Sequence, residues 1–204
     1  MQQEFDSPRG HFPSKFNMPT LPKGTLKLRY ILDQLNLSTH NELICADFGC
    51  NVGGFTSELI KRGYQKVHAI DTGYGALDWK LRNDERVVVR ERTNALHLES
   101  TEKFDLIVID MAWTKQEKSI PVALKHLTPK GAIVSLLKPQ YEEPSPKYKK
   151  AKIFSEEEAR QVAYKTFSKT VCPTHKKSLF HSPIQGGEKR KGSFEFWLVI
   201  EPKA

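Results

Sequence analysis

A glycine-rich turn between two regular segments is the part of this sequence whose residue types and spacing best predict chemistry. The apolar run 43–48 predicts a strand, the run 55–62 predicts a helix, and Gly49, Gly53 and Gly54 lie between them. Glycine lets the backbone of such a turn approach a ligand closely, and open α/β sheets hold nucleotide-like cofactors at turns of this kind. The turn therefore predicts a cofactor site.

The spacing within the turn favours S-adenosylmethionine over a dinucleotide. A dinucleotide fingerprint has its second glycine where Asn51 stands, and Asp47 at the strand end offers carboxylate oxygens to the ammonium group of a methionine moiety. An ordinary glycine-rich turn with a structural role is the alternative. The cofactor-binding residues expected from this segment are Asp47, Gly49, Asn51, Gly53, Gly54 and Phe55.

Polar residues also follow the next strand-like runs. Asp71 ends the run 66–71, where an acid is suited to binding ribose hydroxyls, and Thr93 and Asn94 follow the run 87–90, where they can meet an adenine edge. Taken singly, such residues are more often surface loop residues. Because they recur in order along one sheet edge, the cofactor site is expected to include Asp71, Thr93, Asn94 and Asp110.

The composition fits one globular domain with a polyanionic partner. The chain has 204 residues, 38% of them apolar, and a formal net charge of +8. This surplus favours nucleic acid, with a merely soluble basic protein as the alternative. Three cysteines without paired spacing indicate neither a disulfide framework nor a zinc site, so no metal is expected. No run has the length of a membrane span and the N-terminus has no leader pattern, so a cytoplasmic location is expected.

Strand-like and helix-like runs alternate along the chain, which predicts a doubly wound α/β sheet. A capping-box sequence from Ser155 to Glu158 marks the start of the last helix. The expected helices are 26–37, 55–62, 76–82, 120–127 and 155–169; the expected strands are 43–48, 66–71, 87–90, 104–110, 132–137, 178–181 and 194–201; a turn is expected at 129–131, a loop at 139–152 and an extended arm at 1–23.

Four longer motifs accompany the turn: Asp71-Thr72-Gly73-Tyr74-Gly75, Trp79-Lys80-Leu81-Arg82, Glu91-Arg92-Thr93-Asn94-Ala95 and Leu137-Lys138-Pro139-Gln140-Tyr141-Glu142. Together they resemble the TlyA-type, haemolysin-named rRNA methyltransferases within the FtsJ/RrmJ-like ribose 2′-O-methyltransferases. The resemblance implies that residues 24–204 form a Rossmann-like methyltransferase domain with a doubly wound, mostly parallel seven-stranded sheet. It also implies S-adenosylmethionine as cofactor, RNA 2′-O-methylation as activity, and rRNA or a ribosomal subunit as partner.

The resemblance further implies a Lys-Asp-Lys-Glu catalytic tetrad, which by local motif is Lys27, Asp110, Lys138 and Glu195. Asp110 and Lys138 each end an apolar strand, and a charge that finishes a buried run needs a partner. A purely structural ion pair is the alternative. Burial beside another cation is expected to lower the pKa of Lys138, so that it acts as the base. Lys27 would orient the hydroxyl or stabilise developing negative charge, and Asp110 and Glu195 would position the lysines.

The chain departs from the TlyA pattern at its start, because TlyA-type proteins carry an S4-like RNA-binding domain before the catalytic domain. With residues 1–23 ahead of the matched region, this chain is expected to lack that domain. RNA capture would then rest on the arm, on basic loops or on a partner. Trp113, Tyr141 and Tyr148 are expected to stack on an unpaired base, or else to pack ordinarily. The expected RNA-binding residues are Lys147, Lys149, Lys150, Lys189, Arg190 and Lys191.

Three other functions compete with a ribose methyltransferase. A non-catalytic RNA-binding or ribosome-assembly factor could keep the fold, but four matched charges would then have no purpose. A pore-forming haemolysin would need an amphipathic or apolar membrane segment, which the sequence does not offer. A base methyltransferase would favour an Asn-Pro-Pro-aromatic or cysteine motif where Asp110-Met111-Ala112-Trp113 stands.

Overall fold

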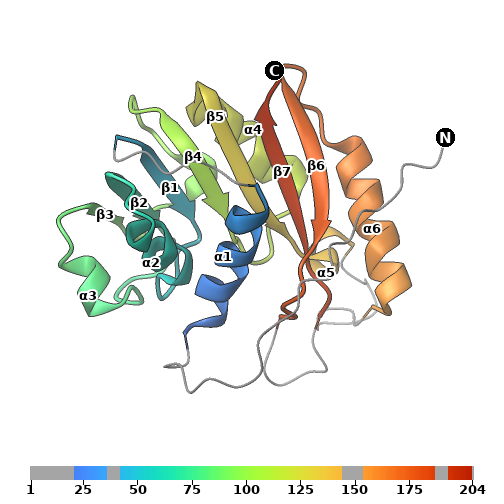
Figure 1. The fold of residues 1–204 in the computed structure, drawn as a ribbon, viewed down its shortest axis with the longest axis horizontal. Helices are drawn as coiled ribbons and strands as arrows, with labels where there is room; N and C mark the ends of the chain where they lie inside the picture. Colours follow the sequence, from blue (N-terminus) through green and yellow to red (C-terminus); the bar gives the residue numbers. More distant parts are fainter. Residues whose placement is uncertain (1–20, 36–41, 144–153, 187–192, 204) are drawn as a thin grey trace.

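Seven strands form one twisted sheet in the order β3-β2-β1-β4-β5-β7-β6 within the part of the chain that the structure describes (Figure 1). The computed structural model describes residues 21–35, 42–143, 154–186 and 193–203. Strands β1 to β5 pair in parallel, whereas β7 runs antiparallel between β5 and β6, which confirms the doubly wound, mostly parallel sheet. The strands are β1 (Ile44–Phe48), β2 (Lys66–Ile70), β3 (Val87–Arg90), β4 (Phe104–Ile109), β5 (Leu127–Leu137), β6 (His175–His181) and β7 (Phe196–Pro202).

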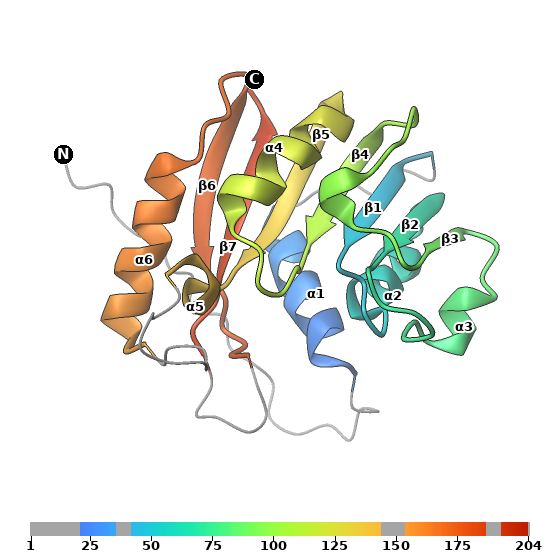
Figure 2. The same cartoon turned by 180° about the vertical axis from the view of Figure 1, so that it is seen from behind.

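Helices cover both faces of the sheet. In Figure 1, α1 and α2 lie in front of the strands, and in Figure 2, seen from behind, α4 does. No helix in the described ranges is both long enough and apolar enough to cross a membrane. The helices are α1 (Lys23–Leu35), α2 (Gly54–Lys61), α3 (Trp79–Arg82), α4 (Gln116–His126), α5 (Pro139–Glu142) and α6 (Glu156–Lys169), with a 3₁₀ turn η1 (Ala95–His97).

The central strands are apolar on both faces, and this is why they form a buried parallel sheet. Successive strand side chains point to opposite faces. Cys45 accordingly packs in a core cluster with Leu28 and Phe55 from α1 and α2, while its neighbour Ala46 packs in a second cluster with Ile120 from α4. The continuous apolar runs in the sequence therefore reflect burial on two sides.

Several predicted boundaries were wrong. Helix α3 begins at Trp79 rather than at residue 76, and strand β6 begins at His175 rather than at residue 178. Helix α4 begins at Gln116, four positions before the expected Ile120, and the expected loop after Lys138 opens with the single turn α5, whose first residue, Pro139, has a backbone angle suited to a helix start. Strand β5 runs through the expected turn at Pro129, which is tolerated because β7 pairs with β5 only from Ile133 onward. Strand β7 starts at Phe196, so Glu195 precedes it.

Other local predictions were confirmed. Ser155 and Glu158 form the expected reciprocal capping box at the start of α6, with Ser155 Oγ accepting the Glu158 N–H at 3.2 Å.

Helix α1 differs from its predicted bounds. It spans Lys23–Leu35 rather than 26–37, so the last residue of the predicted arm belongs to the helix. Residues 1–20 of that arm lie outside the described residues.

The core packing predicts a large loss of stability when a buried side chain of β7 is shortened. Leu198 is 0% exposed and packs between β5 and β6, so Leu198→Ala should lower the free energy of unfolding by about 2–5 kcal/mol. Val171, which is 76% exposed, provides the control, and Val171→Ala should change stability by less than about 0.5 kcal/mol. Urea denaturation of both variants measures the difference; equal effects would contradict this description of the core.

Candidate active site

Four charged residues from distant parts of the chain form two ion pairs at one edge of the sheet. Lys27 Nζ on α1 lies 2.5 Å from Glu195 Oε2, and Lys138 Nζ forms an ion pair with Asp110 Oδ1. These are the four positions expected as a tetrad. The structure brings all four side chains together. A chain with this many charged residues need not place these particular four next to one another.

Strand register explains why the four meet. Asp110 follows β4 and Lys138 follows β5, and because β4 and β5 are parallel neighbours, their carboxyl ends lie side by side. Strand β7 is antiparallel to β5, with Leu137 opposite Phe196. Extending this ladder by one residue sets Lys138 opposite Glu195. The reversed direction of β7 thus brings an acid that precedes a strand to the edge where the other strands end.

Burial makes the Lys27–Glu195 pair obligatory. The two side chains are 8% and 3% exposed, and a buried ion without its partner is strongly unfavourable. Burial raises the pKa of Glu195, while the nearby ammonium groups of Lys27 and Lys138 act in the opposite direction. Glu195 therefore interacts with both lysines and couples the two ion pairs into one cluster.

The pKa of Lys138 departs from the sequence-based expectation. Burial alone would lower it, but the carboxylates of Asp110 and Glu195 outweigh burial and raise the pKa above its usual value. The expected lowering was wrong because it considered the neighbouring cation without the two acids that face Lys138. In the ligand-free protein, Lys138 is an ammonium held by Asp110.

A cavity of about 490 Å³ lies at the same edge and contains most of the expected cofactor residues. This size is ordinary for a cofactor site, and its lining combines carboxylates, an amide and hydroxyls with apolar groups. The lining includes Gly49, Asn51, Asp71, Thr93, Asn94 and Asp110 from the expected set, together with Ile70, Thr72, Ala95, Leu96, Met111, Ala112, Trp113, Thr114 and Lys138.

Asp71 organises the loops around this cavity. Its Oδ2 accepts the Asn51 N–H at 2.9 Å and its Oδ1 accepts the Gly73 N–H at 2.7 Å. A carboxylate has about four acceptor positions, so two remain available for hydroxyls of a bound molecule. Asp71 is thus able to join the two loops and to bind a ribose at the same time.

The glycine turn holds itself together rather than presenting its amides. The N–H groups of Gly49 and Cys50 both donate to the Ile70 carbonyl, at 2.9 and 3.2 Å, and the Gly53 N–H donates to the Cys50 carbonyl at 2.7 Å. Asn51 has φ of 47°, a left-handed conformation that asparagine tolerates, which accounts for its place where a second glycine would stand. The N–H groups of Gly49, Cys50 and Gly53 are therefore occupied within the fold.

Three expected cofactor residues turn out to serve packing. A Cβ on Gly53 would collide with Leu81, and one on Gly54 would lie 3.2 Å from the Gly24 Cα of α1. Phe55 is 4% exposed and its ring centroid lies 5.8 Å from that of Trp197 in the core. None of the three lines the cavity.

Asp47 is fully buried behind the turn. Its Oδ2 accepts both the N–H and the hydroxyl of Thr56, at 2.9 and 2.7 Å, and so caps α2, whose own N-cap residue Gly53 has no side chain to do so. Its Oδ1 has no hydrogen-bond partner in the described structure. Burial, the largest influence, raises the pKa of Asp47 to about 7 despite the two Thr56 contacts.

Two aromatic side chains lie next to each other at this edge: Trp113 lines the cavity, and the Tyr141 ring centroid lies 5.9 Å from Lys138 Nζ. Trp113 is 69% exposed and has φ of 60°, and its ring centroid lies 4.8 Å from that of Tyr141. The third expected stacking residue, Tyr148, lies outside the described residues, as do the six expected RNA-binding residues Lys147, Lys149, Lys150, Lys189, Arg190 and Lys191.

Sequence reasoning missed the residues that support this rim. Thr25 Oγ1 donates to the Gly54 carbonyl at 2.9 Å and joins α1 to α2, and Glu142 accepts an N–H from α4. Glu142 lies in one of the motifs noted in the sequence, but neither contact is between residues near in sequence, so no local pattern could have assigned the roles.

Comparisons with known proteins identify the family to which the chain is similar. A family model described as FtsJ-like methyltransferase matches residues 21–199. A protein of Bacillus subtilis named "Putative rRNA methyltransferase YqxC" is 32% identical over 188 residues, which cover 87% of this chain and 64% of that protein. A Mycobacterium tuberculosis protein named "16S/23S rRNA (cytidine-2'-O)-methyltransferase TlyA" is 44% identical over 101 residues, covering 48% and 38%.

A solved structure described as "Putative hemolysin from Streptococcus thermophilus" superposes with a TM-score of 0.80 at 30% identity, covering 92% of this chain and 69% of that one. The chain spans less than two thirds of the length of the Bacillus and Mycobacterium proteins that it matches.

The raised pKa of Asp47 predicts a specific pH dependence of stability. Its folded pKa of about 7 exceeds the ordinary aspartate pKa of 3.8, so the folded protein binds this proton more tightly than the unfolded chain. Asp47 therefore makes the protein less stable as the pH rises from about 4 to 7. Relative to the wild type, Asp47→Asn should gain stability over that range. Urea denaturation at several pH values measures the gain; a difference independent of pH would contradict it.

Proposed function

The chain belongs to the FtsJ-like methyltransferase family, and we propose that it methylates the 2′-hydroxyl of a ribose in RNA, with rRNA as the substrate. The observation that carries the proposal is the cluster of two ion pairs, Lys27–Glu195 and Lys138–Asp110, of which Asp110 and Lys138 line the cavity. Two lysines buried beside two acids can hold a hydroxyl and accept its proton, whereas a protein that only binds RNA needs neither pair.

S-adenosylmethionine, the methyl donor of such an enzyme, suits the cavity. We assign its ribose to Asp71, whose carboxylate has acceptor positions left, and its adenine edge to Thr93 and Asn94. Gly49 and Asn51 form the adjoining wall. Asp47, with an unpartnered buried Oδ1, lies behind them as a positioning residue. Bound there, S-adenosylmethionine supplies a methyl group on a sulfonium, which is already activated for displacement.

Lys138 is the proposed proton acceptor and Lys27 the residue that orients the hydroxyl. The ribose hydroxyl gives its proton to Lys138 Nζ as its oxygen takes the methyl group, so Lys138 has to be neutral before the reaction. Because Asp110 and Glu195 raise its pKa, only a small part of the protein holds a neutral Lys138 near neutral pH. Alignment of hydroxyl and methyl group supplies much of the remaining rate.

The aromatic pair Trp113 and Tyr141 is the proposed site for the base of the acceptor nucleotide. Both rings lie beside Lys138, and the exposed Trp113 offers a free face on which an unpaired base can stack. Stacking on exposed aromatics requires the base to leave its helix. The acceptor is therefore a nucleotide in a loop or one flipped out of a duplex.

Ribosomal RNA as substrate is supported by the names of the Bacillus and Mycobacterium relatives. The net charge of +8 is consistent with such a partner. We propose that the methyltransferase domain, expected from residue 24 to 204, begins with α1 at Lys23, so that the arm expected at 1–23 ends before this residue. We assign phosphate contacts to Lys147, Lys149, Lys150, Lys189, Arg190 and Lys191.

The first prediction concerns Lys138. Lys138→Ala should lower single-turnover methyl transfer about 10²–10⁴-fold because it removes the base. In the wild type the same rate should rise as the pH increases above neutral, since the raised pKa keeps most Lys138 protonated at lower pH. The measurement is label transfer from S-adenosylmethionine to RNA and ribosomal subunits, with products mapped by resistance to alkaline cleavage.

The matched control is Lys61→Ala, which removes an exposed lysine on α2 and should leave the rate unchanged. Full activity in Lys138→Ala would reject the assignment of the base. Binding of S-adenosylmethionine without transfer to any RNA would instead favour a non-catalytic RNA-binding role.

A second prediction concerns the aromatic pair. Trp113→Ala should raise KM for RNA about 5- to 100-fold, the usual effect of losing one stacked base, and should leave the affinity for S-adenosylmethionine nearly unchanged. Trp79→Ala is the control, because Trp79 is 73% exposed but lies outside the cavity lining. Steady-state kinetics with RNA as the varied substrate distinguish the two; equal KM values would show that Trp113 does not contact the acceptor.

A further inference from the structure

The single-turn helix α5 joins three segments of the proposed acceptor site. It begins directly after Lys138 and carries Tyr141. On one side, Gln140 Nε2 donates to Ser193 Oγ at 3.4 Å, two residues before Glu195. On the other side, Glu142 Oε1 accepts the N–H of Gln116 at 2.9 Å. Gln116 is the first residue of α4 and closely follows Trp113.

The contact of Glu142 is a helix cap supplied from another element. Residue Lys115, at the N-cap of α4, makes no side-chain cap hydrogen bond, so the first amide of the helix depends on an acceptor from elsewhere. A carboxylate is well suited to this place, because the N-terminus of an 11-residue helix carries partial positive charge. Glu142 supplies both the acceptor for this amide and a negative charge at the N-terminus of α4.

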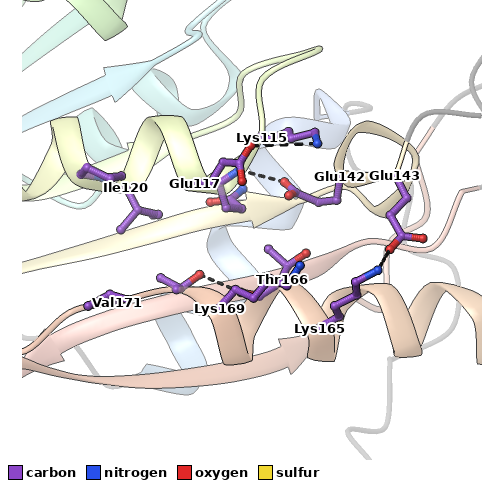
Figure 3. Close-up of a pocket in the computed structure, with 12 residues that line it drawn as sticks. Lys115, Glu117, Ile120, Glu142, Glu143, Lys165, Thr166, Lys169 and Val171 are labelled. Atoms are coloured by element: carbon purple, nitrogen blue, oxygen red, sulfur yellow. Dashed lines mark hydrogen bonds and ion pairs between the residues drawn. The ribbon is translucent and has the colours of Figure 1, made fainter.

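Glu142 is buried in a wall of a second cavity, of about 340 Å³, between α4, α5 and α6 (Figure 3). The residue is 9% exposed. Burial raises the pKa of Glu142 to about 6, while the Gln116 N–H and then Lys115 act in the opposite direction. The charged groups that face this cavity are Lys115 and Glu117 of α4, Lys165 and Lys169 of α6, and Glu143, which follows α5 and forms an ion pair with Lys165.

We infer that Glu142 is a positioning residue: by capping α4 it fixes the segment that carries Trp113 against Tyr141, and so sets the geometry in which the acceptor base is bound. Trp113 needs such an anchor because its ring is mostly exposed and its backbone is left-handed. The inference rests on the proposed function for the identity of the acceptor. The coupling of Glu142 to Trp113 can be tested without any RNA.

Titration of Glu142 gives the inference a distinctive signature. Below a pH of about 6 the carboxyl gains a proton and loses the charge that faces the positive end of α4, so binding of RNA should weaken as the pH falls through this range. The same protonation stabilises the fold, because the pKa of Glu142 in the folded protein exceeds the ordinary glutamate pKa of 4.5. Protonation of Glu142 should therefore weaken RNA binding without unfolding the protein.

The kinetic test compares Glu142→Gln with Glu143→Gln, the same change at the adjacent, more exposed carboxylate. At pH 7.5, a pH chosen about 1.5 units above this pKa, Glu142→Gln should raise KM for RNA about 2- to 30-fold, the range of a weakened helix cap, with little change in kcat or in S-adenosylmethionine affinity. The wild type and Glu143→Gln should show a KM that rises as the pH falls below about 6, and Glu142→Gln should not. Identical KM values and pH profiles in the two variants would overturn the inference.

A spectroscopic test uses the protein alone. The emission of Trp113, taken as the difference between each protein and its Trp113→Phe counterpart, should titrate with a midpoint near 6 in the wild type and in Glu143→Gln, and not in Glu142→Gln. Absence of this midpoint in a wild type that methylates RNA would reject the inference and leave the proposed function standing. A midpoint without methylation of any RNA would support the coupling and reject the function.

Discussion

The buried contact between Lys27 and Glu195 is the interaction on which the rest of this edge depends. Either ion would be strongly unfavourable there without the other. The pair therefore requires α1 to pack against the sheet in one position and β7 to pair with β5 in one register. The position of α1 is fixed further by the Thr25–Gly54 hydrogen bond. A helix that covers the sheet thus also brings Lys27 into the charged cluster beside the cavity.

Two helices at this edge are capped by carboxylates that belong to other elements of the fold. Asp47 from β1 caps α2, and Glu142 from α5 caps α4, in both cases where the residue at the N-cap makes no side-chain bond. Both acids are buried and both have raised pKa values, because burial acts more strongly than the amides they accept from. The elements around the site are therefore joined by groups that titrate near neutral pH.

The glycine-rich turn that predicted a cofactor site shapes that site in another way than its glycine motif suggests. The amides of Gly49, Cys50, Asn51 and Gly53 already donate to the Ile70 and Cys50 carbonyls and to Asp71, so these four N–H groups are not available to a ligand. Gly49 is required because a Cβ there would lie 2.6 Å from the Asp110 carbonyl. The glycine allows the end of β4, and with it Asp110, to approach the turn.

The sequence by itself determined the elements and the edge at which they meet. Apolar runs buried on both faces predicted the parallel strands, and the polar residues that follow them, Asp71 and Asp110 among them, lie at the cavity because parallel strands end at one edge. The capping box at Ser155 was equally local. Resemblance to a family, and not the pattern of charges, selected Lys27 and Glu195 from the many charged residues.

Tertiary structure alone decided the electrostatics and the division of labour between binding and packing. The direction of the Lys138 pKa shift depends on Asp110 and Glu195, which come from other strands. Gly54 packs closely against α1, and Phe55 packs against Trp197. Glu142 caps α4 because the fold places it next to the first amide of that helix. The physical reason is that the pattern of buried apolar residues repeats over a few positions and can be seen in the sequence. The pKa of a charged group and the capping of a helix depend instead on partners that only the folded chain brings within a few ångströms.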